Sequence, residues 1–204
     1  MQSREFRRNL GFHFALLERR STFKQANSSM KKDQISKALI TTYTDFNKAL
    51  NALNSDEFEY APEGKWSAGQ QLEHLIKSTS PVIKGLNYPK FLISYKFGKA
   101  NRPSRTFEAL VERYKERLSA GGRASAPYVP NKVSFEKKEK LQTQLTQNIE
   151  AINHRLNKWS ESQMDEFVFP HPLLGKLTVR EMMYFTIHHA DHHRNLIKIY
   201  LKGV

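Results

Sequence analysis

Along four long stretches of this chain, apolar residues recur every three or four positions with polar residues between them. That spacing is typical of amphipathic α-helices, each with one face in a core. The four predicted helices cover residues 31–54, 68–84, 134–159 and 177–200. Pro81 lies inside the second stretch and predicts a kink or an early end there. The pattern therefore predicts four long helices.

Two of these helices carry clear start signals. Thr178 and Glu181 form a Thr-x-x-Glu capping box at the start of the last helix, and neither Gly nor Pro interrupts the residues up to Tyr200. Ser67 and Gln70 form a similar Ser-x-x-Gln box at the start of the second helix. We expect both helices to begin at these positions.

The remaining segments are shorter and richer in Gly and Pro. A short helix is predicted from Ser104 or Thr106 through Leu118, whereas residues 88–105 and 161–176 are expected to be irregular connections. No alternation of strand type is long enough to predict a sheet. The fold class is therefore all-α: a four-helix bundle with an extra short helix and a long crossover between helices 2 and 3.

Four histidines lie in the middle of the last predicted helix. On a helical wheel His189 and His193 share its apolar stripe, about 40° apart, whereas His188 and His192 lie toward a flank. An i, i+4 histidine pair on a buried face can supply two ligands to one metal ion. The alternatives are a hydrogen-bonded core histidine and a solvated surface cluster. Two buried imidazoles one turn apart favour a metal, because each nitrogen needs a partner.

The second helix contains one histidine, His74. It lies roughly 130° from the centre of that helix's apolar stripe, beside Gln70, Gln71 and Ser78. Periodicity alone therefore predicts a half-exposed flank residue with no special role.

Composition limits the classes of protein that the chain can represent. It has 204 residues, 39% hydrophobic and 26% charged, which are values typical of a globular domain. It contains no cysteine, so disulfides, thiolate zinc ligands and cysteine nucleophiles are excluded. No window approaches eighteen consecutive apolar residues, and we therefore expect no membrane span.

The N-terminal residues differ from the rest of the chain. Residues 1–29 hold six Lys or Arg against two Glu and lack the apolar core of a secretory signal, so we expect an accessory or poorly ordered basic arm. Met30 opens onto the first patterned helix, and the predicted domain spans residues 30–204. We expect a cytoplasmic protein. The formal net charge is +13, but acids are interleaved with the cations. A solvated surface therefore explains the charge better than nucleic-acid binding does.

Two motifs carry a resemblance to a known family. Residues 65–75, KWSAGQQLEHL, and residues 171–193, which begin HPLLGKLT and end HADHH, resemble the DinB-like superfamily in its YfiT-like branch of metal-dependent hydrolases. The resemblance covers the chain from about Met30. It implies a divalent metal held by His74, His189 and His193, a small-molecule substrate that in some relatives is a thiol, and a homodimer. Zinc or nickel is expected first, and iron or manganese would accept the same ligands.

Several functions stay open at this point. The leading hypothesis is a metal-dependent enzyme for hydrolysis or thiol S-transfer, because three neutral imidazoles leave a divalent ion charged and with an open position. Glu73, Asp191 and His192 are candidates for orienting a ligand or moving a proton, and equally for surface or capping roles. The alternatives are a non-catalytic metal-binding or structural bundle, and a basic protein that binds nucleic acid or a membrane surface.

Overall fold

The structure, a computed structural model, describes residues 29–202. The predicted basic arm lies outside the described residues except for Ser29, and the boundary at residue 30 stays a prediction. The predicted four-helix bundle is confirmed, and its helices are α2 (Lys32–Asn51), α4 (Ala68–Asn87), α7 (Lys138–Leu156) and α9 (Val179–Tyr200).

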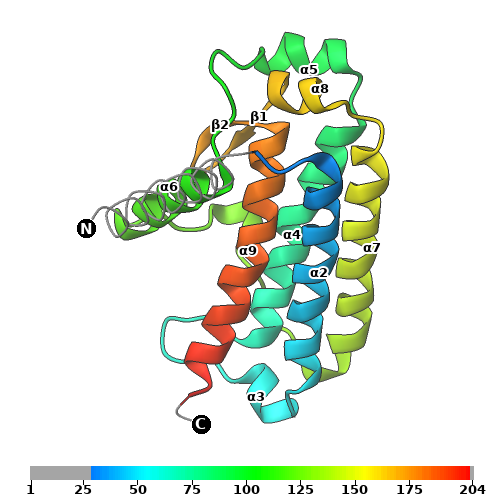
Figure 1. The fold of residues 1–204 in the computed structure, drawn as a ribbon. Coiled ribbons are helices and arrows are strands. Elements are labelled where there is room, and N and C mark those ends of the chain that lie inside the picture. The colour runs from blue at the N-terminus through cyan, green and yellow to red at the C-terminus, as the bar shows by residue number, and fades with distance from the viewer. Residues whose placement is uncertain (1–28, 203–204) are drawn as a thin grey trace, which may run out of the picture. The chain divides into compact units, whose positions relative to one another are not determined.

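The order of the helices around the bundle follows from their contacts. Helix α2 packs against α7 and α9, and α4 packs against the same two helices, so α2 and α4 lie diagonally across the core. In Figure 1, α2 and α9 run in one direction, and α4 and α7 run in the other. Because α4 and α7 are parallel, the chain must return along the bundle between them, and this confirms the long crossover.

The crossover contains most of the shorter elements. Helix α5 (Lys90–Phe97) follows α4, and α6 (Phe107–Ser119) lies across α9, as Figure 1 shows. Thr106 caps α6 by accepting the N–H of Ala109 at 3.2 Å, which confirms the short helix predicted there. Two 3₁₀ turns, η1 (Ala126–Tyr128) and η2 (Phe135–Lys137), then lead into α7.

The predicted apolar stripes meet in the core. Side chains from all four long helices are less than 2% exposed, among them Leu39, Phe46, Leu72, Leu75, Leu145, Ile152 and Tyr184. Burying one Leu or Ile side chain contributes about 1.5–3 kcal/mol. The two predicted capping boxes are also formed: Ser67 accepts the N–H of Gln70 at 3.2 Å, and Thr178 accepts that of Glu181 at 3.1 Å.

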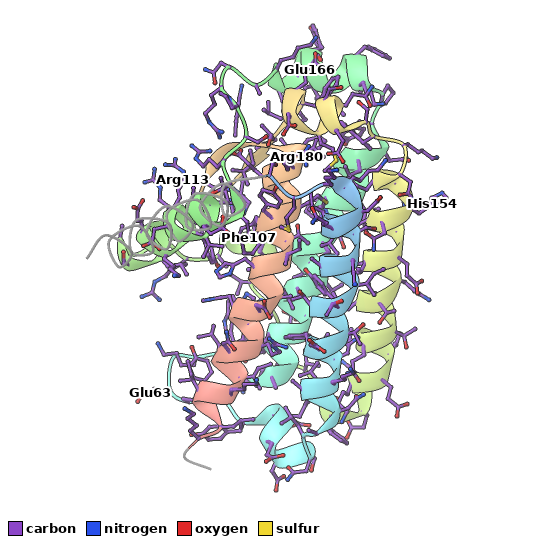
Figure 2. The ribbon with its side chains drawn as sticks, viewed as in Figure 1. Glu63, Phe107, Arg113, His154, Glu166 and Arg180 are labelled. Atoms are coloured by element: carbon purple, nitrogen blue, oxygen red, sulfur yellow. The ribbon has the colours of Figure 1, made fainter. Side chains whose placement is uncertain are left out.

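Charged residues fasten the crossover to the start of α9. Glu181 is fully buried and accepts hydrogen bonds from Arg102 at 2.7 and 2.9 Å and from the Arg105 side chain at 3.0 Å. Arg180, labelled in Figure 2, pairs with Glu161 and Asp165 of α8 (Glu161–Glu166). These ion pairs fix the end of the bundle at which a small hairpin lies.

The small hairpin corrects the predicted irregular connection at residues 161–176. Strand β1 (Val168–His171) pairs antiparallel with β2 (Gly175–Thr178), with Val168 opposite Thr178 and His171 opposite Gly175. Gly175 has a φ of +75°, which a side chain would disfavour. Strands of four residues place only two residues on each face, too few for an alternating pattern to stand out.

Four helical segments also differ from the sequence prediction. Helix α5 lies within the irregular connection predicted at 88–105, α8 lies within that predicted at 161–176, and α3 (Ser55–Glu59) lies in the loop after α2. Helix α4 continues through Pro81 to Asn87. Pro81 lies on an exposed side of α4, while Val82 and Leu86 are buried on the other side, and this packing outweighs the proline. Among residues 29–202, no helix has both the length and the apolar character needed to cross a membrane.

Candidate metal centre

Three histidines from two helices meet inside the bundle. His74 lies on α4, and His189 and His193 lie one turn apart on α9. The Nε2 atom of His189 is 3.1 Å from Nε2 of His74 and 2.9 Å from Nε2 of His193. All three side chains are buried, at 4–5% exposed. The structure thus brings His189 and His193, which the helical wheel predicted, into a single cluster with His74, which the family resemblance implied.

Hydrogen bonds at the far side of two rings fix their tautomers. His74 Nδ1 lies 2.7 Å from the carbonyl oxygen of Tyr128, and His193 Nδ1 bonds to Oε1 of Gln71. Both partners are acceptors, so each Nδ1 must carry the proton and each Nε2 must present a lone pair. The Gln71 amide is itself oriented, because its Nε2 donates to the carbonyl of Trp66 at 3.4 Å.

Because of these tautomers, the three converging Nε2 atoms carry more lone pairs than protons. His189 can place at most one N–H on Nε2, and that single proton cannot point at both neighbouring nitrogens. A cation at the point of convergence would relieve the repulsion. In tetrahedral zinc sites with Zn–N distances of about 2.0–2.1 Å, ligand nitrogens lie about 3.3–3.4 Å apart. The two separations from His189, 3.1 and 2.9 Å, are shorter than that value by about 0.2–0.5 Å, so small shifts of the rings would let the residues hold a divalent ion.

Burial keeps the three rings in the form that binds metals. It lowers the pKa of His74, assisted by the charge of Lys77, and it lowers the pKa values of His189 and His193 well below the usual range. The other histidines of the cluster lower the last two further. All three imidazoles are therefore neutral at pH 7, and a metal would not have to displace protons from them.

The burial of His74 corrects the prediction from periodicity, which made it a half-exposed flank residue. The indole of Trp66 covers it, with ring centroids 4.9 Å apart, and the 3₁₀ turn η1 supplies its hydrogen-bond acceptor. Gln71 is a site residue that the sequence analysis did not identify. A signal existed: Gln71, His74 and Ser78 recur at three and four residues, which makes a second, polar stripe on α4.

Of the three auxiliary candidates, Glu73 has a positioning role. Its carboxylate accepts hydrogen bonds from the backbone and side-chain N–H groups of Asn131 and pairs with Lys77 at 3.4 Å. Lys77 in turn donates to the carbonyl of Val129 at 2.8 Å. These bonds hold the loop that carries the Tyr128 carbonyl against α4.

The other two candidates, Asp191 and His192, lie in different surroundings. Asp191 pairs with Arg194 at 2.7 Å on the surface of α9. His192 lines the cavity beside the cluster, 5.1 Å between ring centroids from His193, and burial lowers its pKa to about 4. His188 instead packs against α6, with its ring 5.8 Å from that of Tyr114. His192 is thus the one auxiliary candidate that reaches the cavity.

A cavity of about 810 Å³ adjoins the cluster. Its wall includes all three histidines and follows α4 between the flanking residues Trp66 and Tyr88. The cavity beside the cluster is therefore large enough for a small organic molecule.

The architecture and this cluster define a four-helix-bundle protein with a buried three-histidine site. The sequence matches the model of the DinB superfamily over residues 38–197, well over half of the chain, so the protein belongs to that superfamily.

Solved structures share the fold. YfiT from Bacillus subtilis, described as a probable metal-dependent hydrolase with an unusual four-helix bundle topology, superimposes with a TM-score of 0.56 at 15% identity, covering 86% of this chain and 89% of YfiT. A conserved protein from Enterococcus faecalis gives 0.55 at 18% identity, covering 84% and 96% respectively. No curated protein gives a significant sequence match.

Proposed function

We propose that the protein is a metal-dependent enzyme that acts on a small molecule, with a divalent ion held by His74, His189 and His193. The observation that carries the proposal is the pair of fixed tautomers at His74 and His193, which aim two lone pairs at one point beside His189. Zinc and nickel are the first candidates for the ion, and iron or manganese would accept the same donors.

The proposed reaction is hydrolysis or thiol S-transfer. A bound zinc ion would supply a water of pKa about 7 or polarise a carbonyl or a thiol. Two cavity residues can form hydrogen bonds there. Burial raises the pKa of Tyr114 to about 12, so its hydroxyl keeps its proton and can donate, and burial lowers the pKa of His192 to about 4, so its ring is neutral and can accept a hydrogen bond. The Trp66 ring, 4.9 Å from His74 and 6.3 Å from His193, shields the cluster from bulk water.

One structure with the same fold supports the hydrolytic alternative, since YfiT is described as a probable metal-dependent hydrolase. The thiol alternative and a homodimer rest on the family resemblance of the two sequence motifs. Both stay predictions, and light scattering on the untagged protein would test the dimer.

Turnover tests the proposal directly. The untagged full chain, loaded with zinc or nickel, would be assayed with chromogenic carboxylic and phosphoric esters and with a small thiol plus chlorodinitrobenzene. We expect metal-dependent turnover that falls at least 100-fold in His193→Ala. His154→Ala is the matched control, because this histidine is exposed on α7, as Figure 2 shows. Tight metal binding without turnover on any of these substrates would favour the non-catalytic bundle.

A further inference from the structure

The cavity beside the histidine cluster is long and mainly apolar. Its wall follows α4 from Gln71 to Gly85, which at 1.5 Å per residue is roughly 20 Å. Aromatic rings line it along this length: Trp66, Tyr88, Phe97, Tyr114, Phe169 and Phe185. Gly85 lets one ring lie against the helix, since a Cβ atom there would be 3.2 Å from the ring of Phe169. Such a wall suits an elongated, apolar ligand.

The charges along the wall have one sign. None of the described residues that line the cavity is Asp or Glu, although the chain contains 20 acidic residues. Three cationic side chains line it: Lys65, Lys84 and Arg123. A positively charged ligand would find no counterion there, whereas a negatively charged ligand would.

Arg123 is the cation best placed to bind a ligand. Like Lys65 and Lys84, it has no ion pair with any residue of the described part of the chain. The neighbouring Gly122 packs on the hairpin turn, since a Cβ atom there would lie 3.3 Å from Cδ2 of Leu173. The backbone next to Arg123 therefore lies against the turn that carries His171, and both residues line the cavity.

His171 adds a neutral donor at the same place. Its Nδ1 accepts the backbone N–H groups of Leu173 and Leu174, each at 3.2 Å, so its proton is on Nε2. Within residues 29–202 no hydrogen bond occupies that Nε2–H. Burial lowers the pKa of His171 to about 4, which keeps the ring in this neutral form at pH 7. A guanidinium and a fixed N–H donor on the wall of one cavity suit a carboxylate or phosphate group.

We propose that this cavity binds an elongated, mainly apolar molecule with one anionic group, and that Arg123 and His171 hold that group. The inference rests on the proposed function, because it names the class of substrate that would reach the histidine cluster.

Binding to the metal-free full chain tests the inference without contribution from the ion. Calorimetry would compare 2-naphthaleneacetate with 2-naphthaleneacetamide, which has nearly the same shape and no charge. We expect the acetate to bind at least about tenfold more tightly. Arg123→Gln and His171→Asn should each reduce that preference to about threefold or less, with the acetamide affinity unchanged. Asn retains an acceptor for the turn, so the hairpin should persist, and circular dichroism checks the fold.

Arg117→Gln is the control, because it removes the same charge from an exposed position on α6 outside the cavity wall. It should keep the tenfold preference. Equal affinities for the two probes, no binding of either to the folded protein, or an unchanged preference in Arg123→Gln would each overturn the inference. If the protein turns over substrate with metal but does not prefer the acetate to the acetamide, only this inference is wrong. If it prefers the acetate but binds no metal, only the proposed function is wrong.

Discussion

The role of Gln71 gives a sharp test of how the site is organised. This side chain is 1% exposed, accepts a hydrogen bond from Nδ1 of His193, and donates to the carbonyl of Trp66. The substitution Gln71→Leu keeps the volume and removes both hydrogen bonds. His193 would then bury an unpaired Nδ1–H, and nothing would hold its proton on that nitrogen.

Two magnitudes follow from this change. Leaving one buried donor unpaired costs about 1–3 kcal/mol of folding stability. Removing the group that orients a metal-ligating imidazole costs about 10–100-fold in metal affinity. Urea unfolding of the metal-free protein measures the first, and competition for zinc with a chromophoric chelator measures the second.

A matched buried glutamine separates the two effects. Gln142 on α7 is 9% exposed and donates to the carbonyl of Asn47 at 3.0 Å, and it does not line the cavity. Gln142→Leu should lower stability by a similar amount and leave zinc affinity unchanged. If Gln71→Leu bound zinc as tightly as the parent, the hydrogen bond from His193 would have no part in positioning a ligand, and the reasoning would be refuted.

Two further predictions concern stability. The metal-free protein should lose stability as the pH falls from about 6.5 toward 4. Burial lowers the pKa of folded His171 to about 4, so between these values the unfolded chain binds the extra proton. The loss is at most about 1.4 kcal/mol per pH unit for this histidine, and urea unfolding at pH 7, 6 and 5 should show a smaller slope in His171→Asn; identical slopes would contradict this. Separately, Glu181→Gln should cost about 3 kcal/mol, because Arg102 and Arg105 lose the buried carboxylate that they share. A change below 1 kcal/mol, again by urea unfolding, would show that these arginines are satisfied by solvent.

The parts of the fold that the sequence predicted are those governed by local rules. The start of α9 follows from Thr178 and Glu181, and the inward direction of His189 and His193 follows from the helical period alone. Glu181 shows the limit of this reasoning. It was recognised as a cap, but its second role depends on Arg102 and Arg105, which the crossover brings back from a distant part of the chain.

The rest depended on tertiary contacts that leave no local period. His74 is buried because Trp66 and a turn fifty-four residues away cover it, and no helical wheel contains that information. The family resemblance supplied His74 where periodicity could not. Gln71 was missed because its partner, His193, lies on another helix.

Elemental analysis of the untagged full chain tests the central claim most directly. The parent, exposed to zinc and nickel and then passed over a desalting column, should retain close to one ion per chain. The double variant His189→Ala, His193→Ala should retain almost none while keeping its helical content, and His154→Ala should match the parent. A parent without bound metal, or a folded double variant that still holds one ion per chain, would contradict the three-histidine metal site.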